Sequence, residues 1–212
     1  MSSGSGVQRE TVQALVWRLI LDPQTARNVA PKFGDKLVFV PSTTSSAIPS
    51  STVQLQHAFE KGVAISLSVL ICGHFPLNYS PLQYYLAVHN GDINALTRQV
   101  LQMLAPDLLR VLREFRAIGF QGDLRPLSAH LMSHVDINPA DIEHRTEEAH
   151  DRLEELILLR SLFGNTDLHH PEMLAFAQGL KMEMANGTNL FQLIEQKFLG
   201  RTIGFLEKIE SG

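Results

Sequence analysis

Two histidines lie four residues apart in the sequence, at His130 and His134. On a helix this spacing puts both imidazoles on one face, and neutral imidazole is the commonest metal ligand in proteins. Four further potential ligands follow them: Asp136, Asp141, His144 and His150. Because the segment 136–139 is expected to break the helix, the spacing does not fix these further ligands. The pattern therefore has two interpretations, a metal-dependent enzyme site that uses His130 and His134 or a solvated polar surface.

The single cysteine, Cys72, ends an apolar run and lies two residues before His74. A catalytic thiolate needs a lowered pKa, which a neighbouring imidazolium can supply. The C-terminal end of a helix acts in the opposite direction, because the negative pole of the helix dipole disfavours a thiolate. We therefore expect Cys72 to be a small buried hydrophobic residue.

Signature motifs of several enzyme classes are absent from the sequence. It contains no Gly-x-Ser-x-Gly of acyl hydrolases, no Gly-x-x-x-x-Gly-Lys-Ser/Thr phosphate loop and no Gly-x-Gly-x-x-Gly dinucleotide loop. One cysteine excludes an internal disulfide framework and a multi-cysteine metal centre. The net charge of −4 and the pI near 6.1 give no basic footprint for nucleic acid. The sequence assigns no catalytic residue, no cofactor and no metal ligand set, and no nucleic-acid partner is expected.

A cluster of aromatic and apolar residues lies between two expected helices. Its members are Phe75, Leu77, Tyr79, Tyr84 and Tyr85. Large aromatic side chains anchor many protein interfaces, so an exposed cluster of this kind is a candidate surface for a protein partner. The alternative is that the same side chains cover the hydrophobic core. We expect the partner-binding residues, if the first interpretation holds, to be these five.

Apolar spacing and capping residues predict a chain of helices with little sheet. Helices are expected over 12–20, 53–71, 81–90, 93–104, 106–118, 138–163, 171–183 and 189–198, and one short strand over 36–40. The segment 41–52 is polar and bounded by prolines, which indicates a flexible loop. The predicted fold class is mainly α, an irregular multi-helix domain with one or two short strands.

Length and composition indicate one domain. With 212 residues, of which 44% are hydrophobic, the chain can bury a substantial core. The segment 1–6 resembles an added leader, and 7–212 is expected to be the single helical domain. The longest apolar run, 63–72, is about half the length of a membrane span. We therefore expect an intracellular protein, cytoplasmic or nuclear, with no membrane association, and the oligomeric state stays open.

Several short motifs occur in the order that is found in one protein family. They are a strand that ends in Pro41, then Phe59-Glu60-Lys61-Gly62, a glycine at Gly73, Ser80-Pro81-Leu82-Gln83-Tyr84-Tyr85, the turn Gly91-Asp92 before a leucine-rich helix pair, the charged-to-apolar helix over 147–160, Ala175-Phe176-Ala177-Gln178-Gly179-Leu180 and Leu190-Phe191-Gln192-Leu193-Ile194. In this order they resemble the N-terminal lobe of HECT-type ubiquitin ligases.

The resemblance implies a protein-docking domain of the ubiquitin-conjugation system that is not catalytic on its own. The catalytic cysteine of that family belongs to a C-terminal lobe, and Cys72 does not occupy the corresponding place. The segment 120–136 is short for the small subdomain that recruits the ubiquitin-conjugating enzyme. The implied partners are a ubiquitin-conjugating enzyme or a C-terminal lobe. The alternatives are an unrelated all-helical scaffold or oligomerisation module and, third, the metal-dependent enzyme that would use His130 and His134.

Overall fold

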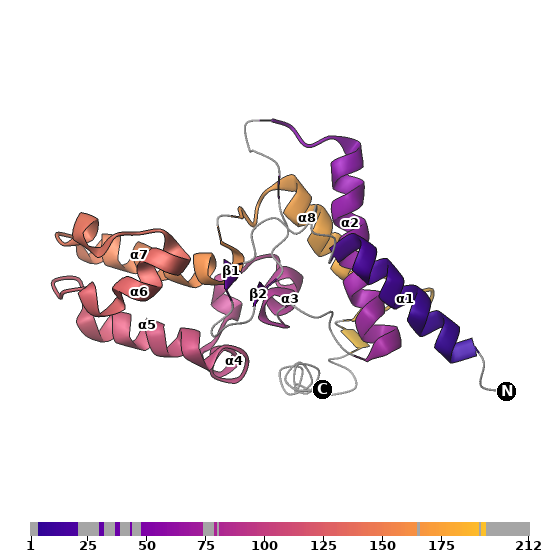
Figure 1. Cartoon of the computed structure of the whole chain (residues 1–212), viewed down its shortest axis with the longest axis horizontal. Coiled ribbons are helices and arrows are strands. Elements are labelled where there is room, and N and C mark those ends of the chain that lie inside the picture. The colour runs from indigo at the N-terminus through magenta and orange to yellow at the C-terminus, as the bar shows by residue number, and fades with distance from the viewer. Residues whose placement is uncertain are drawn as a thin grey trace.

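The computed structural model describes residues 4–20, 30–31, 37–38, 43, 48–73, 79, 81–164, 166–190 and 192–193, and this part of the chain is mostly helical, as predicted. Figure 1 shows two groups of helices with one helix, α3 (Pro81–Val88), between them. One group holds α1 (Gly4–Ile20), α2 (Thr52–Leu67) and α8 (Pro171–Leu180). The other holds α4 (Arg98–Leu104), α5 (Pro106–Ile118), α6 (Ser128–His130) and α7 (Glu147–Phe163).

The elements expected near the two ends of the chain are described only in part. Helix α1 begins at Gly4, inside the segment expected to be a leader. The expected strand over 36–40 is present as β2 (Leu37–Val38), which pairs antiparallel with β1 (Ala30–Pro31), while 36 and 39–40 lie outside the described residues. Of the last expected helix, over 189–198, only its start is described. There the side chains of Asn189 and Gln192 each accept a hydrogen bond from the other's backbone N–H.

Helix α2 has a well-defined beginning and end. The Ser51 hydroxyl accepts a hydrogen bond from the backbone of Gln54, whose side chain accepts one from the Ser51 backbone, and this pair forms a capping box. The helix continues as a π-helical turn, η1 (Ser68–Cys72), and ends at Gly73, whose φ of 79° is readily adopted only by glycine. The expected loop over 41–52 is therefore too long at its C-terminal end, because Ser50 donates to Glu172 of α8 at 2.9 Å and α2 begins at Thr52.

Helices α2 and α8 cross with their backbones in contact. The crossing is formed by Gly62 and Gly179, and a Cβ atom on either one would overlap a backbone carbonyl oxygen of the other helix. Beside it, the buried Ser66 hydroxyl donates to the Leu180 carbonyl at 2.7 Å. Two glycines thus allow a close approach that every other residue type would prevent. This contact builds the first helix group.

Two of the expected helices are split in the structure. The segment over 93–104 consists of a 3₁₀ turn, η2 (Ile93–Ala95), and of α4, for which Thr97 supplies the N-terminal cap. The segment over 138–163 consists of a 3₁₀ turn, η5 (Pro139–Ile142), and of α7, which begins after its own cap, Thr146. The prediction of continuous helices was wrong in both places. Side-chain caps at Thr97 and Thr146 satisfy the backbone N–H groups of a new helix, so the chain can turn before it.

The break before α7 is stabilised by Arg145. Its Nη2 donates to the carbonyl oxygens of Gly119 at 2.5 Å and Gly122 at 3.0 Å, and its Nε donates to Nδ1 of His150 at 3.0 Å. The imidazole of His150 is stacked on the ring of Phe115, with centroids 4.1 Å apart and planes at 10°. Burial, and then the charge of Arg145, lowers the pKa of His150, which keeps Nδ1 available as an acceptor. Arg145 thereby connects the ends of α5 and α7.

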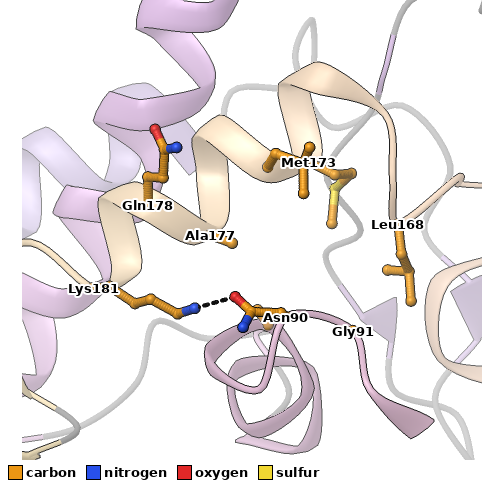
Figure 2. Close-up of a pocket in the computed structure, with 9 residues that line it drawn as sticks. Asn90, Gly91, Leu168, Met173, Ala177, Gln178 and Lys181 are labelled. Carbon is orange, nitrogen blue, oxygen red and sulfur yellow. Dashed lines mark hydrogen bonds between the residues drawn. The ribbon is translucent and has the colours of Figure 1, made fainter.

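Helix α3 connects the two helix groups. The buried amide of Gln83 donates to the Leu162 carbonyl of α7 at 2.6 Å. On the other side, the ammonium of Lys181, at the end of α8, donates to Oδ1 of Asn90 at 2.5 Å, in the turn that follows α3 (Figure 2). The predicted end of this helix near Asn90 and Gly91 is correct, and both residues have positive φ values, 59° and 75°. Helix α3 and the turn after it are thus bonded to α7 on one side and to the end of α8 on the other.

One stretch of the described residues is long and apolar enough to cross a membrane. It is Thr52–Cys72, which joins α2 and η1, with a mean hydropathy of 1.2 in its most apolar window. Core helices of water-soluble proteins meet the same two criteria, and this one packs against α1 and α8. The absence of membrane association therefore stays a prediction.

Candidate functional site

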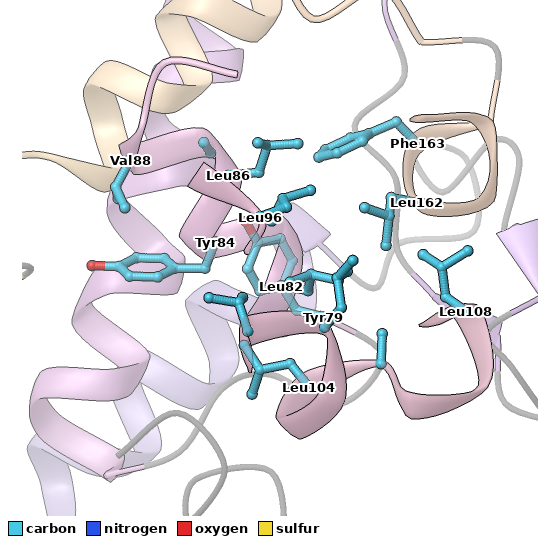
Figure 3. Packing of buried hydrophobic residues seen from close by; sticks show 14 of the residues in the cluster. Tyr79, Leu82, Tyr84, Leu86, Val88, Leu96, Leu104, Leu108, Leu162 and Phe163 are labelled. Atoms are coloured by element: carbon cyan, nitrogen blue, oxygen red, sulfur yellow. The ribbon is translucent and has the colours of Figure 1, made fainter. Parts of the chain in front are cut away.

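The five candidate partner-binding residues do not form one exposed surface. Tyr79 is 5% exposed and Tyr84 is 0% exposed, and both belong to the hydrophobic core (Figure 3). Tyr85 is half-buried, with its ring centroid 4.5 Å from that of His89. Phe75 and Leu77 lie outside the described residues. The expectation of an exposed aromatic cluster is therefore wrong for Tyr79 and Tyr84.

Tyr84 is buried because α3 is covered on two sides. Helix α8 contacts it on one side and α7 on the other, so a helix whose sequence has an aromatic stripe is buried almost all round. The ring of Tyr79 lies 6.3 Å from that of Phe176 on α8. Burial raises the pKa of both phenols, so Tyr79 and Tyr84 stay neutral at physiological pH. These two side chains stabilise the fold and are not accessible to a partner.

His130 and His134 do come together, as their spacing predicts. His130 ends α6 and His134 lies in the π-helical turn η4 (Leu131–Val135), with ring centroids 4.5 Å apart and planes at 33°. The His130 Nε2 atom lies 3.0 Å from the Ser161 hydroxyl of α7. Burial, the neighbouring His134 and the charge of Arg110 lower the pKa of His130 to about 4, and burial lowers that of His134.

Within the described part of the chain, the structure does not gather a third metal ligand at this pair. Among the described residues, no group of three or more His, Cys, Asp or Glu side chains could hold a metal ion. His144 is exposed, and His150 is buried against Phe115 beside Arg145. The further ligands that follow the pair in sequence are therefore not brought to it as a metal-binding group. Cys72 is half-buried and packs against the core, consistent with the hydrophobic role expected for it.

Acidification is expected to destabilise the chain through the histidine pair. Because the pKa of His130 is about 4 in the folded state and about 6.5 in an unfolded chain, the unfolded state binds more protons between these pH values. The free energy of unfolding should therefore fall as the pH is lowered from about 6.5 to about 4. Urea titrations at half-unit pH steps measure this slope. In His130→Gln, proton uptake on unfolding near pH 5 should fall by up to about one proton. If the free energy of unfolding of this variant depends on pH as it does in the wild type, the low pKa of His130 is wrong.

A shallow groove of about 390 Å³ lies beside the histidine pair, between α5 and the segment formed by α6 and η4. Its charged residues come from α5, where Arg110 pairs with Glu114 at 3.2 Å and with Asp107 at 3.9 Å. His130, Ser133 and His134 line the opposite side. On the same π-helical turn, the side chain of Met132 is 61% exposed. The groove thus combines charged groups on one wall with imidazoles on the other, near an exposed apolar side chain.

Two further pockets lie elsewhere in the structure and share Gly91 and Leu168 as lining residues. The sequence did not indicate them. The smaller pocket has a volume of about 170 Å³ and ends at Lys181, and the larger has a volume of about 520 Å³. Lys181 and Asn90 are 91 residues apart, so no local spacing could join them. The one local signal was the Asn90-Gly91 turn, which predicts the shape of the chain there but not what faces it.

Comparison of the chain with protein-family models, with curated proteins and with solved structures found no match.

Proposed function

We propose that this chain is a protein-docking domain of the ubiquitin-conjugation system, similar to the N-terminal lobe of HECT-type ligases and not catalytic on its own. One observation carries the proposal. Two motifs on which the resemblance rests, over 59–62 and 175–180, lie more than a hundred residues apart in sequence and pack directly against each other at Gly62 and Gly179. Motifs that occur by chance need not be neighbours in space, whereas parts of one helix crossing must be.

The docking surface that we propose is the end of the molecule formed by α5, α6 and η4. It includes 128–135, the later part of the segment 120–136, which the resemblance relates to recruitment of the ubiquitin-conjugating enzyme. Met132 offers an exposed apolar side chain there, and the charged wall of α5 lies in the same helix group. Apolar anchors within a polar surround are typical of protein interfaces, and methionine adapts to more than one partner shape. The histidine pair then helps to position η4 through Ser161.

The test is a binding titration of the whole chain against a panel of ubiquitin-conjugating enzymes. We expect one or a few of them to bind saturably with micromolar affinity, as is usual for transient docking. Met132→Glu should weaken that binding more than about five-fold, because it places a charge at the apolar anchor. Val53→Glu is the matched control, because Val53 is 63% exposed, lies on α2 in the other helix group and changes charge equally.

Three outcomes would contradict the proposal. If no enzyme of the panel binds the folded chain, the resemblance carries no docking function. If Met132→Glu and Val53→Glu weaken binding equally, the docking surface is not at η4. If the chain instead forms a concentration-dependent dimer that Met132→Glu abolishes, sedimentation would identify it as an oligomerisation module.

A further inference from the structure

The smaller of the two pockets lies between the turn after α3 and one face of α8 (Figure 2). Its walls are apolar, and they are formed by Ala87, Leu168, Met173, Leu174 and Ala177. One end is polar, where Lys181 and Asn90 meet through their 2.5 Å hydrogen bond. The pocket thus has an apolar body and a single cationic end.

Among the described residues, no acidic group balances the charge of Lys181. Its hydrogen-bond partner is the neutral side-chain amide of Asn90, and among the described residues no carboxylate forms an ion pair with it. The side chain is half-buried, and this burial lowers the pKa of its ammonium group. A half-buried ammonium whose described neighbours carry no negative charge favours an anion that arrives from outside.

The larger pocket adjoins the smaller one. Both are lined by Gly91 and Leu168, and a Cβ atom on Gly91 would lie only 3.5 Å from the Leu168 side chain. Its walls include Ile93, Leu156 and Leu159, and its polar groups come from Asp136, Arg160, Thr166, Asp167 and His169, so the acidic residue of a ligand is expected at Lys181 and not in the larger pocket. The two pockets, with volumes of about 170 Å³ and about 520 Å³, are therefore neighbours on a line from Lys181 past Leu168 toward α7, and this pair of adjoining pockets forms the groove.

We infer that this groove binds an extended segment of a partner protein, which places one large apolar side chain in the smaller pocket and an adjacent acidic side chain against Lys181. The size of the pocket favours this occupant, because about 170 Å³ is below the range of about 300–1,000 Å³ typical of small-molecule sites and suits a single side chain. The larger pocket gives the rest of the segment a place to lie. This inference goes beyond the proposed function and depends only on the groove.

The binding test uses three short peptides with blocked ends. The first is Ser-Gly-Glu-Leu-Gly-Ser, the second has Lys in place of Glu, and the third has Ala in place of Leu. Binding to the full chain is followed by NMR, through the methyl signal of Met173 and the amide signal of Gly91. We expect the Glu-Leu peptide to shift both signals saturably with a Kd of about 1 mM or tighter. The peptides with Lys or Ala should bind at least about ten-fold more weakly.

Charge reversal on the protein separates this site from a non-specific effect. Lys181→Glu should invert the preference, so that the Lys-Leu peptide binds better than the Glu-Leu peptide. Lys181→Gln should remove the preference without inverting it, and it also serves if the first variant fails to fold. The matched control is Arg98→Glu, an equal charge change at the exposed beginning of α4, which should leave the preference as it is.

Three results would overturn the inference. The first is the absence of any shift with the Glu-Leu peptide while the chain is folded. The second is equal affinity for the peptides with Glu and Lys. The third is a saturable shift of the same signals by hexanoate alone, with none by the peptides, which would make the groove a site for small carboxylic acids. None of these results bears on binding to ubiquitin-conjugating enzymes, so the two proposals fail independently.

Discussion

Gly62→Ala is expected to lower the free energy of unfolding by at least about 3 kcal/mol. The added Cβ would overlap the carbonyl oxygen of Phe176 and lie 2.7 Å from the backbone nitrogen of Leu180. Both atoms belong to the backbone of α8, so no side chain can rotate away and the two helices must separate. Helix propensity predicts the opposite sign, since alanine is favoured over glycine inside a helix by about 1 kcal/mol. The sign of the measured change therefore tells which effect dominates.

The matched control for this variant is Gly6→Ala. Gly6 also lies in a helix, but a Cβ there would meet no heavy atom within 4 Å, so the change should be neutral or slightly stabilising. Gly179→Ala should be as harmful as Gly62→Ala, because its Cβ would overlap the Phe59 carbonyl oxygen and lie 3.0 Å from the backbone nitrogen of Val63. Urea denaturation followed by far-UV circular dichroism measures all three variants. Equal stability of Gly62→Ala and Gly6→Ala would contradict the close crossing of α2 and α8.

Tyr84→Ala should destabilise the chain by about 3–5 kcal/mol, the usual cost of removing a buried aromatic ring. Its side chain is fully buried in the core that α3 shares with its neighbours, so truncation leaves a cavity that the surrounding helices cannot fill (Figure 3). Any loss of partner binding in this variant would then follow from unfolding. Thermal and urea denaturation, read alongside a binding titration, distinguish this from the loss of an interface anchor.

Two variants control for the size and position of the ring. Tyr84→Phe keeps the ring volume and should cost far less than Tyr84→Ala. Tyr85→Ala removes a neighbouring ring that is only half-buried and should also cost less. If Tyr84→Ala stays as stable as the wild type and loses a binding partner, the burial of Tyr84 in the core is wrong and the original partner-surface interpretation returns.

Much of the helical architecture could be predicted from local sequence. Helix α5 has the predicted bounds, Pro106–Ile118. Gly73 ends the helix formed by α2 and η1 with a positive φ, as expected. Both depend on signals that lie within a few residues of each other: proline at a first helical position, a glycine after the last turn and apolar spacing in between. The break before α7 has one local signal, its cap Thr146, but the contacts that stabilise the break are distant in sequence. It depends on Arg145 reaching carbonyl groups 23 and 26 residues earlier in the chain.

The candidate sites show the same division between local and distant information. The proximity of His130 and His134 follows from their spacing, whereas Ser161, which contacts His130, is 31 residues away and gave no signal. The aromatic stripe of α3 was visible in the sequence. What covers that stripe was not, because amphipathic spacing shows that a face is apolar without showing whether core or solvent meets it. The sequence therefore leaves two interpretations of Tyr84 open, a partner surface and the core, and the structure places its side chain in the core.

The crossing of α2 and α8 also has a consequence for how the chain folds during synthesis. The hydrogen bond between Ser66 and Leu180 joins residues 114 positions apart, so α2 leaves the ribosome long before its partner helix exists. Contacts of such high sequence separation form late and slow folding, because a long loop must close first. Helices α4 to α7 make mostly near-neighbour contacts and can assemble earlier. Helix α1 is made before α2 and packs against it, but until α8 is made the face of α2 that packs against α8 has no native partner, and this face is exposed to aggregation and to chaperones.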